Sequence, residues 1–232
     1  MAAASTYFDL TRDLSVSLIL VLPLLVAYQV GLFVIGHRVI NGADFVTRLV
    51  YPEYGQKGLV LFNLCVVAVF LAAIIRLERQ RRFRPSLFLP LVVESSVYAS
   101  FLGTLILFVM RKSFIMSVGA GFDHSVRALI LSIGAGVNEE IFFRLLLIGL
   151  LQYVFGDFLG MKDGAAAVVA VVASSLVFSA AHYVGAHGDR LEWVSFIYRF
   201  LAGVIFALLY RYRSFAVAVY THAIYDILVL VP

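Results

Sequence analysis

The chain consists of long apolar stretches separated by short polar segments. Seven stretches reach the roughly 17–25 residues that a membrane-spanning α-helix needs. They are Leu14–Ile35, Leu59–Ile75, Leu87–Met110, Val126–Tyr153, Ala165–Tyr183, Val194–Tyr210 and Phe215–Val231. This pattern predicts an all-α fold, a polytopic transmembrane helical bundle with about seven spans.

Composition supports the membrane interpretation. The 232-residue chain is 62% hydrophobic and 14% charged, whereas soluble proteins average roughly 25% charged residues. So few charges exclude a cytosolic globular enzyme, a disordered chain and a nucleic-acid-binding protein. Cys65 is the only cysteine, which excludes a disulfide-built secreted domain. The flank before Leu14 is not basic, so the first span is predicted to be a signal anchor rather than a cleaved signal peptide.

The positions of the arginines predict the orientation. Positively charged loops stay on the cytoplasmic side, and the segment after the second span contains Arg76, Arg79, Arg81, Arg82 and Arg84. Arg211 and Arg213 fall on the same side if the spans alternate, whereas Arg111 and Lys112 fall on the opposite side. We therefore expect a cytoplasmic N-terminus. The short loops favour a bacterial cytoplasmic (inner) membrane.

No repeat or linker divides the chain, so we expect one structural unit with two parts. Residues 1–125 contain three predicted spans, and residues 126–232 contain four. The span Ala165–Tyr183 is rich in alanine and serine. Small side chains let helix backbones approach closely in lipid, which predicts a central position for that helix. Gly134-Ala135-Gly136 in the fourth span permits close packing or a local break.

Ionisable side chains inside the predicted spans are the candidate functional groups, because a charge at membrane depth costs several kcal/mol. They are Glu94, Glu139, Glu140, Arg144, His182, His222 and Asp226. Glu94 is either a second partner for Arg144 or a packing group. A rise of about 1.5 Å per residue puts Glu139, the two histidines and Asp226 in the middle or outer half of the bilayer, where they can converge. That depth favours a substrate cleaved near the outer face.

Spacing along the helices suggests roles for these groups. Glu140 and Arg144 are four residues apart, so they share a helix face and can pair. Glu139 points about 100° away and has no partner within its own helix. A carboxylate neutralised by a fixed cation is a poor proton acceptor, whereas an unpaired buried one suits a general base. His222 and Asp226 are also four apart, so the carboxylate can orient the imidazole or share a proton with it.

Three segments resemble the motifs of the CPBP family, which comprises CAAX proteases and bacteriocin-processing enzymes. Glu139-Glu140-Ile141-Phe142-Phe143-Arg144 matches the Glu-Glu-x-x-x-Arg motif. Phe178-Ser179-Ala180-Ala181-His182 is similar to the second motif, Phe-x-x-x-His. His222-Ala223-Ile224-Tyr225-Asp226 is similar to the third, which often ends in asparagine. The motifs occur in order within Asn138–Asp226, and the first three spans contain none.

The resemblance implies a glutamate-type intramembrane endopeptidase that acts on a membrane-anchored protein or peptide. A CAAX-like tail, a sorting tail and a peptide precursor are the substrate types in view. In this interpretation Glu139 and His182 activate the attacking water, and His222 and Asp226 stabilise the oxyanion. Because Asp226 stands where asparagine is frequent, orienting His222 is an equal alternative for it. Glu140 and Arg144 complete the predicted catalytic set. Their role is to stabilise the helix and to set the electrostatic field around the other groups.

Two alternatives stay open from the sequence. If a divalent metal such as zinc is used, its ligands would be Glu139, His182 and His222, although the His-Glu-x-x-His signature is absent. A non-proteolytic membrane protein, such as a proton-coupled transporter or an immunity or scaffold factor, would use the same charges for proton coupling or assembly. Presenilin-like and rhomboid-like proteases fit badly, because their Gly-x-Gly-Asp and Gly-x-Ser-x-Gly motifs are absent.

Overall fold

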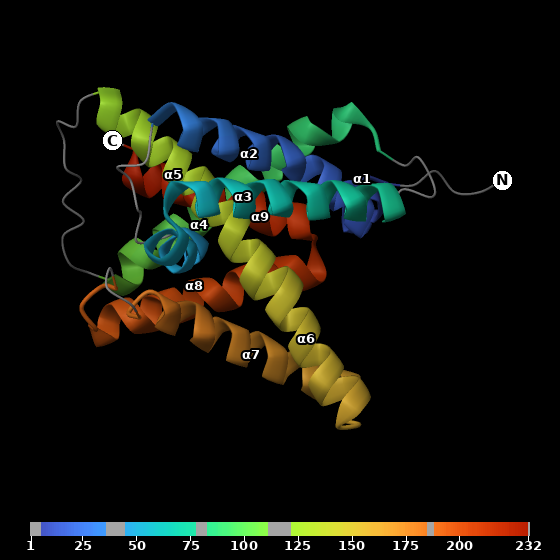
Figure 1. The fold of residues 1–232 in the computed structure, drawn as a ribbon. Coiled ribbons are helices and arrows are strands. Elements are labelled where there is room, and N and C mark those ends of the chain that lie inside the picture. The colour runs from blue at the N-terminus through green and yellow to red at the C-terminus, as the bar shows by residue number, and fades with distance from the viewer. Residues whose placement is uncertain (1–5, 36–44, 78–82, 111–121, 185–187, 232) are drawn as a thin grey trace.

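The computed structural model describes residues 6–35, 45–77, 83–110, 122–184 and 188–231, and every element within these ranges is a helix (Figure 1). In chain order they are α1 (Tyr7–Arg12), α2 (Leu14–Ile35), α3 (Phe45–Leu77), η1 (Pro85–Leu87), α4 (Phe88–Met110), α5 (Phe122–Glu140), η2 (Ile141–Ile148), α6 (Gly149–Gln152), η3 (Tyr153–Phe158), α7 (Asp163–Ala181), α8 (Trp193–Tyr212) and α9 (Phe215–Leu230). Here η1 is a 3₁₀-helix, whereas η2 and η3 are π-helices. The predicted all-α helical bundle is confirmed.

The number of full-length spans is lower than predicted. Within the described ranges, five helices are long and apolar enough to cross a membrane: Leu14–Leu32, Pro85–Leu105, Ser125–Phe158, Asp163–Ala181 and Trp193–Tyr212. The predicted span Leu59–Ile75 lies within the longer helix α3 (Phe45–Leu77), whose apolar part among the described residues is Leu64–Arg76, and the last predicted span corresponds to the shorter helix Phe215–Leu230. At about 1.5 Å per residue, the 16 residues of α9 fall short of a hydrocarbon core about 30 Å thick. The chain is an integral membrane protein whose apolar segments are not all full spans.

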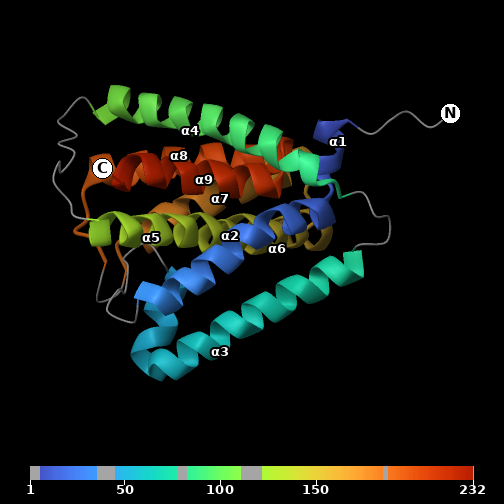
Figure 2. The ribbon, with the colours of Figure 1, turned by 90° about the horizontal axis from the view of Figure 1, so that it is seen from above.

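The short helix α9 occupies the centre of the bundle. It contacts α2, α4, α5 and α8, and Figure 2 shows it between α4 and α5. Every residue from Phe215 to Ala223 is buried. Because α9 packs against protein on several sides, its apolar character reflects burial in the bundle, which hydropathy alone does not distinguish from contact with lipid.

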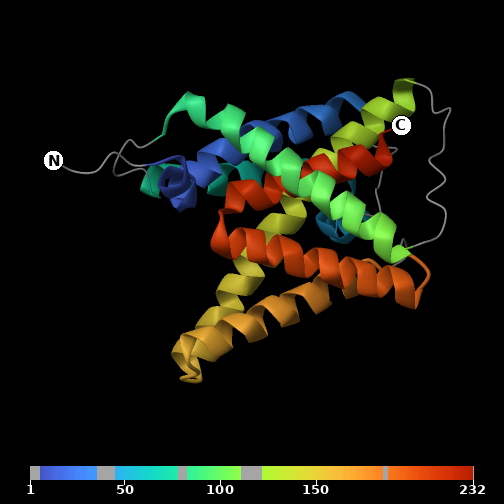
Figure 3. The ribbon, with the colours of Figure 1, turned by 180° about the vertical axis from the view of Figure 1, so that it is seen from behind.

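The predicted central position of the alanine-rich helix is wrong. Helix α7 lies beside α8 at the edge of the bundle, as the opposite views in Figures 1 and 3 show. Val168 and Val172 on its outer face are 64% and 41% exposed. Its small residues cover one face, where Ala170 and Ser174 are fully buried. Small side chains therefore indicate a close approach on one side of a helix and do not require neighbours all round it.

Close helix packing aligns α5 with α9. A Cβ added at Gly136 would lie 2.7 Å from the backbone nitrogen of Ala223, so only glycine permits this approach. A Cβ at Gly134 would overlap the Tyr28 ring of α2. The glycine pair thus serves close packing, and the contact at Gly136 brings Glu139 to the same level as His222.

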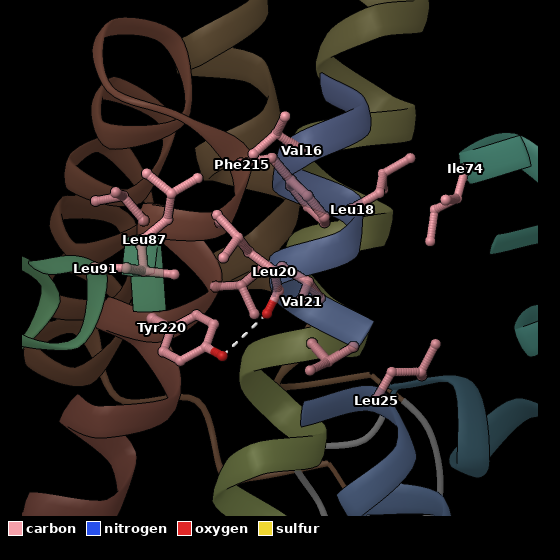
Figure 4. Close-up of a cluster of buried hydrophobic side chains, with 14 of the residues drawn as sticks. Val16, Leu18, Leu20, Val21, Leu25, Ile74, Leu87, Leu91, Phe215 and Tyr220 are labelled. Atoms are coloured by element: carbon pink, nitrogen blue, oxygen red, sulfur yellow. Dashed lines mark hydrogen bonds between the residues drawn. The ribbon is translucent and has the colours of Figure 1, made fainter. Parts of the chain in front are cut away.

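The main apolar cluster lies between α2 and α9. Figure 4 shows Val16, Leu20 and Val21 of α2 facing Phe215 and Tyr220 of α9. The Tyr220 hydroxyl donates a hydrogen bond to the Leu20 carbonyl at 3.0 Å. This bond satisfies a buried hydroxyl, which would otherwise be costly. It forms only when Tyr220 and Leu20 lie at the same level, so it favours one axial register of α9 against α2.

Candidate active site

The first motif spans the junction between an α-helix and a π-helix. Glu139 and Glu140 end α5, and Arg144 lies in the π-helical turns of η2. A π-helix carries i→i+5 hydrogen bonds and is frequent at functional sites. The hydroxyl of Ser174 on α7 donates a hydrogen bond of 2.7 Å to the Phe143 carbonyl, which anchors this wider segment. The motif alone predicts an ordinary α-helix, so the π-helix is not apparent from the sequence.

Glu140 connects two partners from different elements. Its Oε2 lies 3.1 Å from Nε of Arg144, one helical turn away. Its Oε1 accepts a hydrogen bond of 2.9 Å from Nδ1 of His222 on α9. The predicted pairing of Glu140 with Arg144 is therefore observed, and the bond to His222 is an addition that spacing within one helix could not reveal.

Arg144 is fully buried among aromatic rings. Its guanidinium carbon lies 4.6 Å from the centroid of the Phe178 ring and 5.8 Å from that of Phe206. Both Nη atoms are buried and lack a hydrogen-bond partner within the part of the chain that the structure describes. Cation–π contacts and the Glu140 carboxylate thus compensate for the lost hydration of this charge.

The imidazole of His222 is fixed by two contacts, a stacked aromatic ring on one face and a hydrogen bond at Nδ1. It stacks on Phe206 with ring centroids 4.4 Å apart and an interplanar angle of 13°. Glu140 engages Nδ1, so Nε2 faces the other two carboxylates, 3.9 Å from Oε2 of Glu139 and 3.7 Å from Oδ2 of Asp226. These distances exceed a direct hydrogen bond and suit a bridging water.

Glu139 is buried beside His222 but lies farther from that imidazole than Glu140 does. Its side chain is 4% exposed, and Oε2 lacks a hydrogen-bond partner among the described residues. A buried polar atom left without a partner requires an explanation such as a catalytic role or a bound water. The predicted pairing of Glu140 is thus present in the geometry, and the role of Glu139 stays a prediction.

His182 lies one aromatic ring away from this cluster. It caps α7 at its C-terminal end and donates a hydrogen bond of 2.9 Å from Nδ1 to the Phe178 carbonyl. The Phe178 ring contacts both histidines, with centroids 5.2 Å from His182 and 6.0 Å from His222. The spacing of four between Phe178 and His182 predicts that they share one helix face, but not the contact with His222. The tertiary place of Phe178 between two histidines and a guanidinium depends on how α7, α8 and η2 pack.

Glu94 belongs to a different cluster. It pairs with Arg213 and accepts a hydrogen bond of 2.6 Å from the Tyr7 hydroxyl. The Arg213 guanidinium also lies 4.3 Å from the centroid of the Phe8 ring. Burial, together with the bond to Glu94, raises the pKa of Tyr7 above its ordinary value. Glu94 is therefore not a second partner for Arg144; it joins α4 to α1 and to the turn before α9.

The proposed metal ligands are not arranged as a metal site. Among the residues that the structure describes, no three His, Cys, Asp or Glu side chains form a group that could hold a metal ion. A zinc site requires three or four ligands converging at about 2.0–2.3 Å from one point. Glu139, His182 and His222 do not fit this requirement, so no catalytic step is derived through a metal.

The C-terminal part of the chain matches a known protein family. Residues 121–228 match the family model described as "Type II CAAX prenyl endopeptidase Rce1-like". Searches of curated proteins and of solved structures found no match. The matched range contains all three motifs and every residue of the cluster around His222.

Proposed function

Residues 121–228 are an Rce1-like domain of the CPBP type, and from this premise we propose that the protein is an intramembrane endopeptidase. Its substrate is a membrane-anchored protein or peptide, such as a CAAX-like tail, and the cleaved bond lies in or next to the bilayer. The proposal rests on the different contacts of two adjacent glutamates, Glu139 and Glu140. Glu140 lies 3.1 Å from Nε of Arg144 and accepts a hydrogen bond of 2.9 Å from His222, whereas Glu139 is 3.9 Å from His222 and its buried Oε2 has no hydrogen-bond partner among the described residues.

In the proposed mechanism, Glu139 is the general base. A water between Glu139 and His222 loses a proton to the carboxylate, and its oxygen attacks the carbonyl carbon of the scissile peptide bond. The C–N bond then breaks, and the proton held by Glu139 passes to the leaving amine. His182 contacts the Phe178 ring, which also contacts His222, so we assign His182 a positioning role through that ring in place of the direct contact with water that the sequence suggested.

His222 and Asp226 face the developing oxyanion. Donors fixed in place before the reaction contribute most where charge develops. Glu140 already orients the imidazole through Nδ1, so Asp226 is not needed for that task. Three carboxylates share this buried space with one guanidinium, and closely spaced carboxylates share protons. We therefore assign Asp226 the role of a neutral carboxylic acid that donates a hydrogen bond, as asparagine would.

Replacing Asp226 with asparagine tests this assignment. We expect cleavage to stay within about tenfold of wild type, because asparagine keeps a neutral donor in the same place. The measurement is kcat/KM for a peptide that the wild type cleaves. A loss on the order of 10⁴ would contradict the assignment, because that is the size of effect seen where a carboxylate fixes the tautomer of a catalytic histidine.

The activity itself is tested on a broad substrate pool. The protein, purified in detergent, is incubated with membrane-anchored peptides that include prenylated CAAX tails, and mass spectrometry reads the cut sites. We expect one or more defined cuts that persist in the presence of a chelator. Loss of cleavage with the chelator and recovery with zinc would instead assign Glu139, His182 and His222 as ligands. No cut across the pool, with proton-coupled uptake that depends on Glu139, would favour a transporter.

We further propose that the N-terminus lies in the cytoplasm of a bacterial cell, with the protein in the cytoplasmic membrane. The Arg12 guanidinium donates hydrogen bonds to the Tyr212 carbonyl, so the N-terminal helix and the Arg211–Arg213 turn are at the same end of the bundle. Positively charged ends stay in the cytoplasm. Arg79, Arg81, Arg82, Arg111 and Lys112, which also entered the prediction, lie outside the described residues.

A further inference from the structure

Two tyrosines from different helices meet beside the proposed site. The hydroxyl of Tyr198 on α8 and that of Tyr225 on α9 form a direct hydrogen bond. The Tyr225 ring is 6% exposed and packs with Ala99, Leu102 and Ala202. Tyr198 is only half-buried. Nothing in the spacing of the motifs singles out this pair, because Tyr225 occupies a variable position and Tyr198 lies outside all three motifs.

The two tyrosines have two hydroxyl protons, and the hydrogen bond between them requires only one. Each phenol carries one O–H donor, and one of the two protons is shared between the hydroxyls. The other proton remains available to a further acceptor, and a buried donor without an acceptor is costly. Tyr225 directly precedes Asp226 on α9, and both tyrosines pack in the cluster of Phe206, whose ring stacks on His222, so the pair lies next to the proposed site.

Exposure within the cluster increases toward Asp226. The side chains of Glu140 and Arg144 are fully buried, Glu139 and His222 are 4% and 5% exposed, and Asp226 is 17% exposed. Tyr198, like Asp226, is intermediate in exposure, whereas Tyr225 is buried. Asp226 and Tyr198 are therefore the residues of this group that a peptide outside the bundle can contact.

We propose that Tyr198, supported by Tyr225, binds the substrate at the open side of the site. Tyr225 donates its proton to the Tyr198 oxygen, and Tyr198 donates its own proton to a backbone carbonyl of the bound peptide. Every peptide offers such carbonyls, and a peptide entering the membrane interior needs donors for them. This inference rests on the proposed endopeptidase function.

Single substitutions separate this role from a structural link between α8 and α9. If the pair only joins the helices, Tyr198→Phe and Tyr225→Phe delete the same hydrogen bond and have equal effects. If Tyr198 contacts the substrate, Tyr198→Phe also deletes the substrate bond, whereas Tyr225→Phe leaves it in place. We expect both variants to lower the Tm by the same amount, and only Tyr198→Phe to raise KM by about tenfold. Tyr210→Phe, elsewhere on α8, is the matched control.

A binding measurement keeps the two proposals distinguishable. In a Glu139→Gln background, the affinity for a fluorescent prenylated CAAX peptide in detergent micelles is compared with and without Tyr198→Phe and Tyr225→Phe. We expect about tenfold weaker binding only with Tyr198→Phe. Equal affinities for the two phenylalanine variants, or no binding by the Glu139→Gln parent, would overturn the substrate-contact role. Undiminished cleavage by Glu139→Gln would instead overturn the proposed mechanism and leave this comparison valid.

Discussion

Replacing Glu139 with glutamine is expected to reduce kcat for peptide cleavage by about 10³-fold, within the range for loss of a general base. Glutamine has the same shape but cannot accept a proton at neutral pH. Because the lost carboxylate oxygen has no hydrogen-bond partner in the described chain, the fold should not depend on it. The Tm should therefore stay at or above that of the wild type. The measurements are single-turnover cleavage in detergent and thermal unfolding of the same samples.

Two control variants sharpen this prediction. Glu192→Gln changes an exposed glutamate just before α8 and should leave both kcat and Tm unchanged. Glu139→Asp keeps the carboxylate but withdraws it by one methylene, and a displacement of about 1 Å can cost about 10²-fold. We therefore expect the order wild type, Glu139→Asp, Glu139→Gln. If Glu139→Gln retained wild-type kcat, the general base would have to be another group.

Replacing Arg144 with methionine is expected to destabilise the fold by about 3–5 kcal/mol, the typical cost of breaking a buried ion pair from one side. Methionine fills much of the volume among the rings of Phe143, Phe178 and Phe206, so a cavity contributes little. The remaining Glu140 carboxylate would face an apolar pocket with only His222 as partner. We expect a large fall in Tm and little folded protein in detergent.

A double variant isolates the charge from the packing. Glu140→Gln combined with Arg144→Met removes both charges together, and replacing a buried ion pair by uncharged groups is often neutral. We expect it to recover most of the Tm but not the activity, because glutamine holds the His222 imidazole less firmly than a carboxylate does. Arg211→Met, an exposed control, should change stability by less than about 0.5 kcal/mol. Normal stability of Arg144→Met alone would show that the pair is dispensable.

The amino-acid sequence determines those features that depend on contacts within one helix. Apolar stretches of sufficient length establish the helical membrane bundle. In lipid, an α-helix forms all its backbone hydrogen bonds within one segment, which an isolated extended segment cannot do. The spacing of four between Glu140 and Arg144 sets their pairing, since the helical period alone brings them together. The same period brings Asp226 to within 3.7 Å of His222.

Tertiary structure decides which helices supply the remaining partners. Glu140 binds His222, 82 residues away, and Glu94 pairs with Arg213 rather than Arg144. These contacts depend on the crossing and axial register of helices, which in turn depend on packing such as the approach of Gly136 to Ala223. The central place of the short helix α9 has the same origin. Apolar side chains suit protein and lipid equally, so hydropathy cannot tell a helix enclosed by its neighbours from one that faces the bilayer.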